Sequence, residues 1–146
     1  MKREEGRRLY LEVSTPTKSL FRGFVNSVNV PIEDGMLGIL PGHINTLARI
    51  TPGILWARSE NKLLVFFISE GFMEIVKDRV FIISEDAEIA EKLEEEGLEK
   101  EKKELQERLL QAQSISEKEE IRRSLLLNNL KIKALQFFKT STYSTK

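Results

Sequence analysis

The stretch "DGMLGILPGH", residues 34–43, combines three glycines, a proline and the chain's only histidine. Glycine-rich segments can cradle phosphate groups, and a histidine can serve as an acid, a base or a metal ligand. A phosphate-binding P-loop needs Lys-Ser or Lys-Thr after its last glycine, whereas Gly42 is followed by His43 and Ile44. The glycine spacing also differs from that of dinucleotide-binding loops. The sequence therefore argues against a phosphate cradle in this stretch.

His43 also has none of the companions that catalysis or metal binding would require. The chain has no second histidine and no cysteine, and no base–nucleophile arrangement is visible. The many carboxylates of residues 85–108 lack the spaced oxygen ligands and central glycine of a calcium loop. We therefore expect no catalytic residue, no metal site and no cofactor, and we interpret the glycines as residues that permit tight turns and positive φ.

Charge and composition restrict the possible partners. The 146 residues carry 23 basic and 23 acidic side chains, so no overall field favours nucleic acid. The charges are unevenly spread, because residues 85–108 hold 11 acidic and 5 basic groups while the remaining C-terminal residues hold 3 and 7. The start of the chain is charged and resembles neither a signal peptide nor a transit peptide. The apolar run at residues 63–68 is too short to span a bilayer.

The first 84 residues have the pattern of β-strands. "LYLEVST", residues 9–15, alternates apolar and polar side chains, and "FVNSVNV" (24–30) and "ILWARS" (54–59) behave similarly. The continuous apolar run "KLLVFFIS", residues 62–69, is typical of a strand covered on both faces. Turn signals separate these segments, and Trp56 is interpreted as a core residue. Residues 1–86 are therefore predicted to form a β-sandwich or barrel.

From about Asp86 the pattern becomes helical. Proline disappears, glutamate, lysine and leucine dominate, and apolar residues recur at helical spacing, first over 98–112 and then over 121–135. Between these two sets, Ser116 followed by Glu119 matches a capping box that would begin a second helix. We predict that residues 87–146 form an antiparallel α-helical hairpin.

Taken in order, the residues resemble the epsilon subunit of F-type ATP synthase. The resemblance rests on Pro16, on Phe21 with Gly23, on "DGMLGILPGHINTLARITPG" and on "ISEGFMEIVKDRVFIISEDAE". It implies an antiparallel β-sandwich of about ten strands followed by a helical hairpin. Beyond residue 90 the likeness is mainly one of length and layout.

The resemblance implies a non-enzymatic rotor subunit of the central stalk. Such a subunit would couple the membrane ring of ion-carrying c subunits to the catalytic head and restrain ATP hydrolysis through its C-terminal helices. Implied partners are the gamma subunit, the c ring and, transiently, the catalytic alpha and beta subunits, with no nucleic acid. The implied location is peripheral, on the cytoplasmic face of the bacterial inner membrane or on a plastid thylakoid.

The resemblance also implies two sets of site residues. A loop that docks on the ring or on gamma would comprise Glu33, Asp34, Gly35, Met36, Gly38, Pro41, Gly42 and His43. A regulatory basic helix would present Arg122, Arg123, Lys131, Lys133 and Lys139, either to acidic segments of the catalytic subunits or to the acidic first helix.

Three features depart from the family pattern. Met36 stands where an acidic residue is common. The family's ATP-binding motif is degenerate at Leu93, Glu94, Gly97 and Leu98, with glycine and leucine in place of arginine and alanine, so we expect no nucleotide site. Residues 1–8 form a charged extension before the first strand.

Two other classes of protein remain as alternatives. One is a transcription factor that binds RNA polymerase through its charged helical hairpin, and the other is a small ligand-binding sensor domain. Co-purification with synthase subunits, with polymerase or with neither separates the three.

Overall fold

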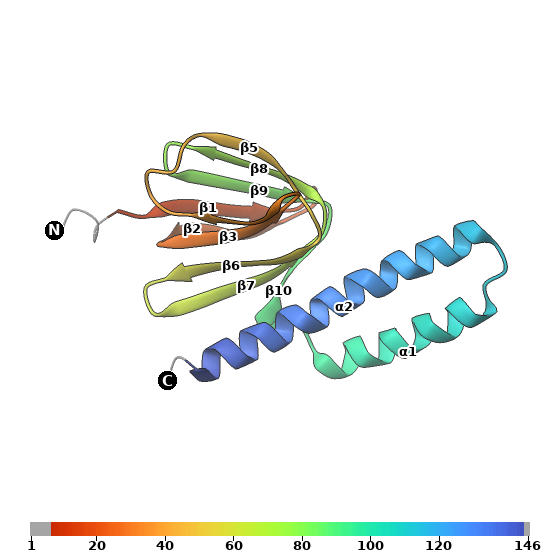
Figure 1. Ribbon diagram of the computed structural model, residues 1–146. Coiled ribbons are helices and arrows are strands. Elements are labelled where there is room, and N and C mark those ends of the chain that lie inside the picture. Colours follow the sequence, from red (N-terminus) through yellow and green to blue (C-terminus); the bar gives the residue numbers. More distant parts are fainter. Residues whose placement is uncertain (1–6, 145–146) are drawn as a thin grey trace.

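The computed structural model describes residues 7–144, which form ten strands followed by two helices (Figure 1). The β-sandwich followed by a helical hairpin is confirmed. The strands are β1 (Leu9–Ser14), β2 (Ser19–Val25), β3 (Ser27–Ile32), β4 (Gly35–Ile39), β5 (Thr46–Ile50), β6 (Gly53–Ser59), β7 (Lys62–Ile68), β8 (Gly71–Val76), β9 (Arg79–Ser84) and β10 (Ala87–Ile89). A 3₁₀ turn (Ala90–Lys92) leads to the helices α1 (Glu95–Gln111) and α2 (Ile115–Ser144).

The strands form one sheet that folds over on itself. Its order is β10-β7-β6-β3-β5-β8-β9-β1-β2, and β4 pairs with β3 outside this path. β3 and β5 share a single pair, Ile32 with Ile50, and the sheet turns from one layer to the other at this point. Side chains such as Leu11, Phe66 and Met73 are almost completely buried between the layers. β10 continues the sheet to Ile89 by pairing with β7.

One segment that the sequence predicted as a single strand is divided. "FVNSVNV" contains the end of β2 and the start of β3, with Asn26 between them. The Asn26 amide donates to the Arg58 carbonyl (2.7 Å), and its side-chain oxygen accepts from the Glu60 amide (2.6 Å). The prediction of one strand was wrong. Val25 and Val28 are both fully buried, but residues three apart in one unbroken strand point to opposite faces of the sheet, so the strand must be interrupted between them.

The second helix is capped two residues earlier than predicted. α2 begins at Ile115, and the Ser114 hydroxyl accepts a hydrogen bond from the Glu117 amide at 3.1 Å. The Glu117 carboxylate in turn accepts from the Gln113 amide at 3.5 Å. The predicted cap, Ser116, is therefore wrong, because Ser114 and Glu117 have the same spacing and lie closer to the end of α1.

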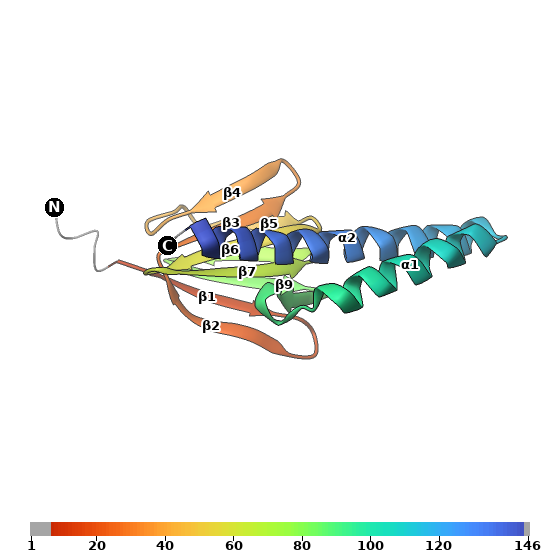
Figure 2. The same cartoon turned by 90° about the horizontal axis from the view of Figure 1, so that it is seen from below.

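Helix α2 covers the outer face of β6 and β7, as the view from below shows (Figure 2). The rings of Trp56 and Phe137 are 5.0 Å apart, and Phe67 and Ala134 are completely buried in the same cluster. β7 is therefore covered on both faces, as its continuous apolar run predicted. The distal part of the hairpin has a small core of its own around Leu105 and Ile121. No helix within residues 7–144 is long and apolar enough to cross a membrane.

Candidate docking site

The predicted docking residues lie in β4 and in the two turns at its ends. Glu33 and Asp34 form an exposed two-residue hairpin turn between β3 and β4, where Gly35 has φ of 120°. The Pro41–His43 turn follows the other end of the strand. Five residues of extended chain separate the two turns by about 16 Å. Gly38 lies within β4, and Met36 is 51% exposed. A partner that contacts both turns must therefore extend along β4.

The turn around Gly42 is fixed by the neighbouring β8–β9 turn. The Gly42 amide donates to a carboxylate oxygen of Asp78 at 2.7 Å, and Arg7 donates to the other oxygen at 3.1 Å. The hydrogen bond from the Gly42 amide and, to a smaller degree, the one from Arg7 hold the pKa of Asp78 below its usual range. Gly42 has φ of 88°, which favours glycine. The Gly42 turn is thus a shaped, anchored surface.

His43 takes part in this local structure. Its Nδ1–H donates to the Ile44 carbonyl oxygen at 2.8 Å, and the side chain is half-buried. Within residues 7–144, no group of three or more histidine, cysteine or acidic side chains could hold a metal ion.

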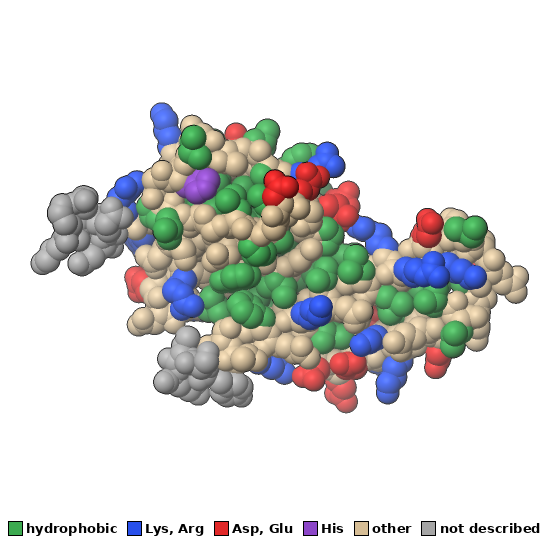
Figure 3. All heavy atoms as spheres, viewed as in Figure 1, with side chains coloured by type: hydrophobic (Ala, Val, Ile, Leu, Met, Phe, Trp, Pro, Cys, Tyr) green, Lys and Arg blue, Asp and Glu red, His purple; other side chains and the backbone are tan. Residues whose placement is uncertain are grey.

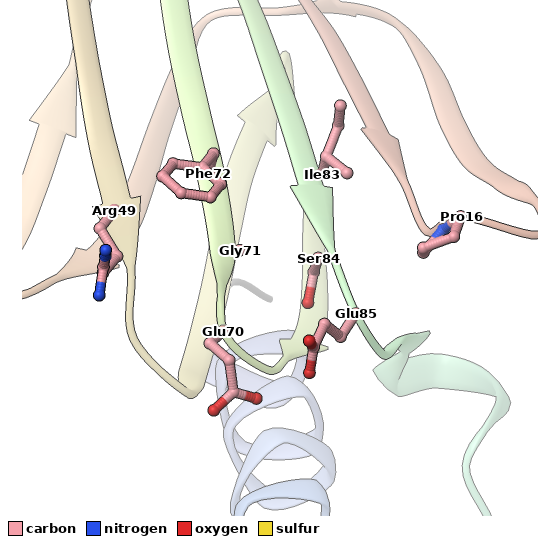
Figure 4. A pocket seen from close by; sticks show the side chains of 8 residues that line it. All are labelled: Pro16, Arg49, Glu70, Gly71, Phe72, Ile83, Ser84 and Glu85. Carbon is pink, nitrogen blue, oxygen red and sulfur yellow. The ribbon is translucent and has the colours of Figure 1, made fainter.

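An exposed apolar patch lies on the outer face of β5, β8 and β9. It consists of Leu47, Phe72 and Ile83, which are 74%, 56% and 55% exposed, and Phe72 lies directly opposite Ile83 in the sheet. Beside it, a cavity of about 330 Å³ is lined by Phe72, Ile83, Pro16 and Arg49 (Figure 4). We did not predict this patch from the sequence. The sequence contained a sign of it, because "GFMEIV" places apolar side chains on both faces of the strand.

Two glutamates at the edge of the same cavity hold helix α2. Glu70 and Glu85 each follow a serine, and Ser69 and Ser84 are buried with their hydroxyl oxygens 3.1 Å apart. Figure 4 shows both glutamates at the ends of the strands, near the helix. Arg123 of α2 forms a bidentate hydrogen-bonded pair with Glu70, and its distance to Glu85 is 3.9 Å. We call these three residues the Arg123 cluster. Hydrogen bonding by Arg123 lowers the pKa of Glu70.

The other predicted basic residues of α2 have different surroundings. Lys131 pairs with Glu88 of β10 at 2.9 Å. Burial lowers the pKa of Lys131, but the hydrogen bond and the charge of Glu88 outweigh it, so the pKa is raised. Lys139 reaches Glu95 of α1 at 3.1 Å. Arg122 and Lys133 are exposed, with no ion pair among the described residues. Figure 3 shows basic side chains along the visible face of the hairpin.

The expectation that the acidic first helix attracts the basic residues of α2 holds for one of the three paired cations. Lys139 contacts α1, whereas Arg123 and Lys131 pair with carboxylates of the β-sandwich. The reason is that α2 lies across β6 and β7 over much of its length, so the β-sandwich is its nearer neighbour there.

The degenerate nucleotide motif lies at the start of α1. Leu93 and Glu94 precede the helix, Gly97 is exposed in its first turn, and Leu98 is buried. A side chain at Gly97 would point into open space. A nearby cavity is lined by Glu94, Glu96 and Glu99 together with two lysines, which gives it no excess of positive charge for a triphosphate.

The fold defines a class of protein in which a β-sandwich is followed by a C-terminal helical hairpin. Comparison with known families gives the identity. The family model "ATP synthase, Delta/Epsilon chain, beta-sandwich domain" matches residues 8–90, and the chain belongs to the epsilon-chain family of ATP synthase, a family of non-catalytic stalk subunits. These matches do not favour the RNA polymerase alternative.

Individual relatives agree with this assignment. The ATP synthase epsilon chain of Lawsonia intracellularis is 35% identical over 105 residues, covering 72% of this chain and 79% of the relative. That of Bacillus subtilis is 34% identical over 99 residues, covering 68% and 75%. Among solved structures, a chain of the Euglena gracilis mitochondrial ATP synthase OSCP/F1/c-ring has the same fold, with a TM-score of 0.66 at 20% identity over 92% of this chain and 81% of that chain.

Proposed function

We propose that this chain is a rotor subunit of the central stalk that couples the membrane ring of c subunits to the catalytic head. Family membership supports the assignment to the stalk. The main support for a docking role is the exposed apolar patch, which no element within residues 7–144 covers. Exposed apolar surface of this kind is typical of protein interfaces.

Each surface has a proposed partner. The apolar patch binds the gamma subunit. β4 and the turns at its two ends contact the ring or gamma, through Glu33, Asp34, Gly35, Met36, Gly38, Pro41, Gly42 and His43. The chain is then peripheral to the membrane, held there through the complex, on the cytoplasmic face of a bacterial inner membrane or on a thylakoid. It needs no cofactor.

The docking role is tested by binding to a purified complex of gamma with the c ring. Phe72→Glu should weaken binding at least tenfold, because a carboxylate would be desolvated in the interface. Leu126→Glu is the matched control, since Leu126 is 50% exposed on α2, away from the patch. Equal binding by wild type and Phe72→Glu would refute docking through the patch.

The helical hairpin formed by α1 and α2 is the proposed regulatory domain, and the β-sandwich is the proposed docking domain. The domain boundary predicted between residues 86 and 87 moves to the end of β10, because Ala87–Ile89 pairs with β7 in the sheet. In the closed form described here, α2 lies on the β-sandwich and the Arg123 cluster helps to hold it. In an extended form, Arg122, Arg123, Lys131, Lys133 and Lys139 would meet acidic segments of the alpha and beta subunits and restrain ATP hydrolysis. Two conformations with similar free energy respond to small changes in contacts.

A further inference from the structure

A second cavity lies on the outer face of β1, β2 and β9, beside the β8–β9 turn. Its volume is about 480 Å³, within the range of small-molecule sites. Its lining combines three cations with three aromatic rings, contributed by Arg8, Lys77, Arg79, Tyr10, Phe24 and Phe81. We call this the arginine–aromatic pocket.

The three cations of the pocket have no carboxylate partner among residues 7–144. The Arg8 guanidinium lies 5.1 Å from the centre of the Phe24 ring, and that of Arg79 lies 5.6 Å from the centre of the Tyr10 ring. An aromatic face orients a guanidinium without using its N–H donors, which stay in the plane of the group. Arg8 and Arg79 therefore present oriented donors that have no carboxylate partner among residues 7–144.

Two carboxylates also line the pocket, but both are already engaged. Asp78 accepts from the Gly42 amide and from Arg7. Glu12 accepts from the Tyr10 hydroxyl at 3.1 Å and lies 3.6 Å from Arg22. Arg7 and Arg22 thus offset the two negative charges, and the three cations of the pocket remain as a net positive charge.

The aromatic rings form an apolar wall next to these donors. Tyr10 makes edge-to-face contacts with Phe24 and Phe81, with ring centres 5.6 Å and 6.5 Å apart. We propose that the pocket binds a phosphate ester, with the phosphate on the guanidinium groups and the organic part against the rings. Guanidinium groups match phosphate oxygens in a bidentate geometry.

A phosphate fits better than an extended acidic segment of a protein, because all three cations line one cavity. Two sources of the phosphate share this chemistry: a soluble organic phosphate and the headgroup of an anionic phospholipid. The proposal is independent of docking through the apolar patch, which lies on β5, β8 and the far end of β9.

The test uses the full-length chain, labelled with ¹⁵N, at low ionic strength. Titration with pyrophosphate should give saturable NMR shifts of the Arg8 and Arg79 side-chain Nε–H signals. Arg79→Gln should weaken binding about tenfold, as expected for loss of a charge-assisted hydrogen bond. Arg58→Gln makes the same change in net charge on β6, in the other layer, and should bind as wild type does.

A second arm identifies the source of the phosphate. The chain is sedimented with phosphatidylglycerol vesicles and, for comparison, with phosphatidylcholine vesicles. If it sediments only with phosphatidylglycerol, and Arg79→Gln abolishes this co-sedimentation, the ligand is a lipid headgroup. Binding of pyrophosphate without sedimentation supports a soluble ester. The proposal is overturned if neither probe binds, or if Arg58→Gln weakens binding as much as Arg79→Gln. It is also overturned if a polyglutamate peptide occupies the same signals more tightly than pyrophosphate, because the surface would then be one for acidic protein.

Discussion

Replacing Arg123 with alanine should shift the hairpin toward an open form by a predictable amount. The Arg123 and Glu70 side chains are 47% and 38% exposed, so solvent screens the pair. Pairs of this kind contribute about 0–1 kcal/mol, and the bidentate geometry places this one toward the upper end. Glu85, at 3.9 Å and 72% exposed, adds little. A loss of about 1 kcal/mol changes the ratio of open to closed forms roughly fivefold.

The apolar contact between helix and sheet should matter more. Phe137 packs on Trp56, and both side chains are half-buried. Removing a fully buried phenylalanine costs about 3–5 kcal/mol, so Phe137→Ala should cost roughly half of that. The open fraction should therefore increase in the order wild type, Arg123→Ala, Phe137→Ala.

The absence of cysteine from the chain makes this measurement direct. Spin labels on Glu60→Cys, in the β6–β7 turn, and Gln136→Cys, on the exposed side of α2, report the distance between sandwich and helix. Arg122→Ala is the matched control, because it removes the same charge from the next position of α2, and Arg122 forms no ion pair among the described residues. If the two arginine variants give the same distance distribution, the Arg123 cluster does not hold the hairpin.

The same labels test the dependence on pH and salt. The hydrogen bond from Arg123 is the main cause that lowers the pKa of Glu70 in the closed form, so opening the hairpin should raise that pKa toward its ordinary value near 4.5. Stability of the closed form is therefore present above that value and is lost as the pH falls through the lowered pKa of the closed form. Acid and high salt should open the wild type more than they open Arg123→Ala.

Three further predictions follow from the same structure. In the assembled synthase, deleting residues 114–146 should raise ATP hydrolysis. Because this deletion also uncovers the apolar face of β7, Arg122→Glu provides a second test. This variant should raise ATP hydrolysis and leave the open fraction of the isolated chain unchanged. No increase with either variant would exclude inhibition by the hairpin. Gly71→Ala should prevent stable folding, since its Cβ would lie 1.9 Å from the Ile83 carbonyl oxygen, whereas Gly97→Ala should raise the free energy of unfolding by about 0.5–1 kcal/mol; thermal denaturation decides both. Millimolar ATP should leave the amide NMR signals of residues 94–98 unshifted, and saturable shifts there would show that the degenerate motif still binds nucleotide.

Local patterns predicted the strands and helices, whereas contacts between distant segments could not be predicted. The unbroken apolar run of β7 correctly indicated two covered faces. The glycine-rich stretch gave no sign that Gly38 lies inside a strand, because glycine density alone does not distinguish a loop from two turns joined by extended chain. The pairing of Arg123 with Glu70 depends on how α2 crosses the sheet, which no pattern within either segment encodes.

The two outer faces of the sandwich carry similar apolar side chains, but only one of them is covered within residues 7–144. On β7, the outward side chains Leu63, Val65 and Phe67 are buried because α2 covers them. On β5, β8 and β9, the outward side chains Leu47, Phe72 and Ile83 have similar chemistry but no cover within residues 7–144. Burying each of the three would contribute roughly 1–2 kcal/mol, so a partner that covers them gains about 3–6 kcal/mol before the cost of association. A screened surface ion pair contributes about 1 kcal/mol at most. The apolar patch can therefore hold the chain on its partner while charged contacts, being weak, leave the hairpin free to open and close.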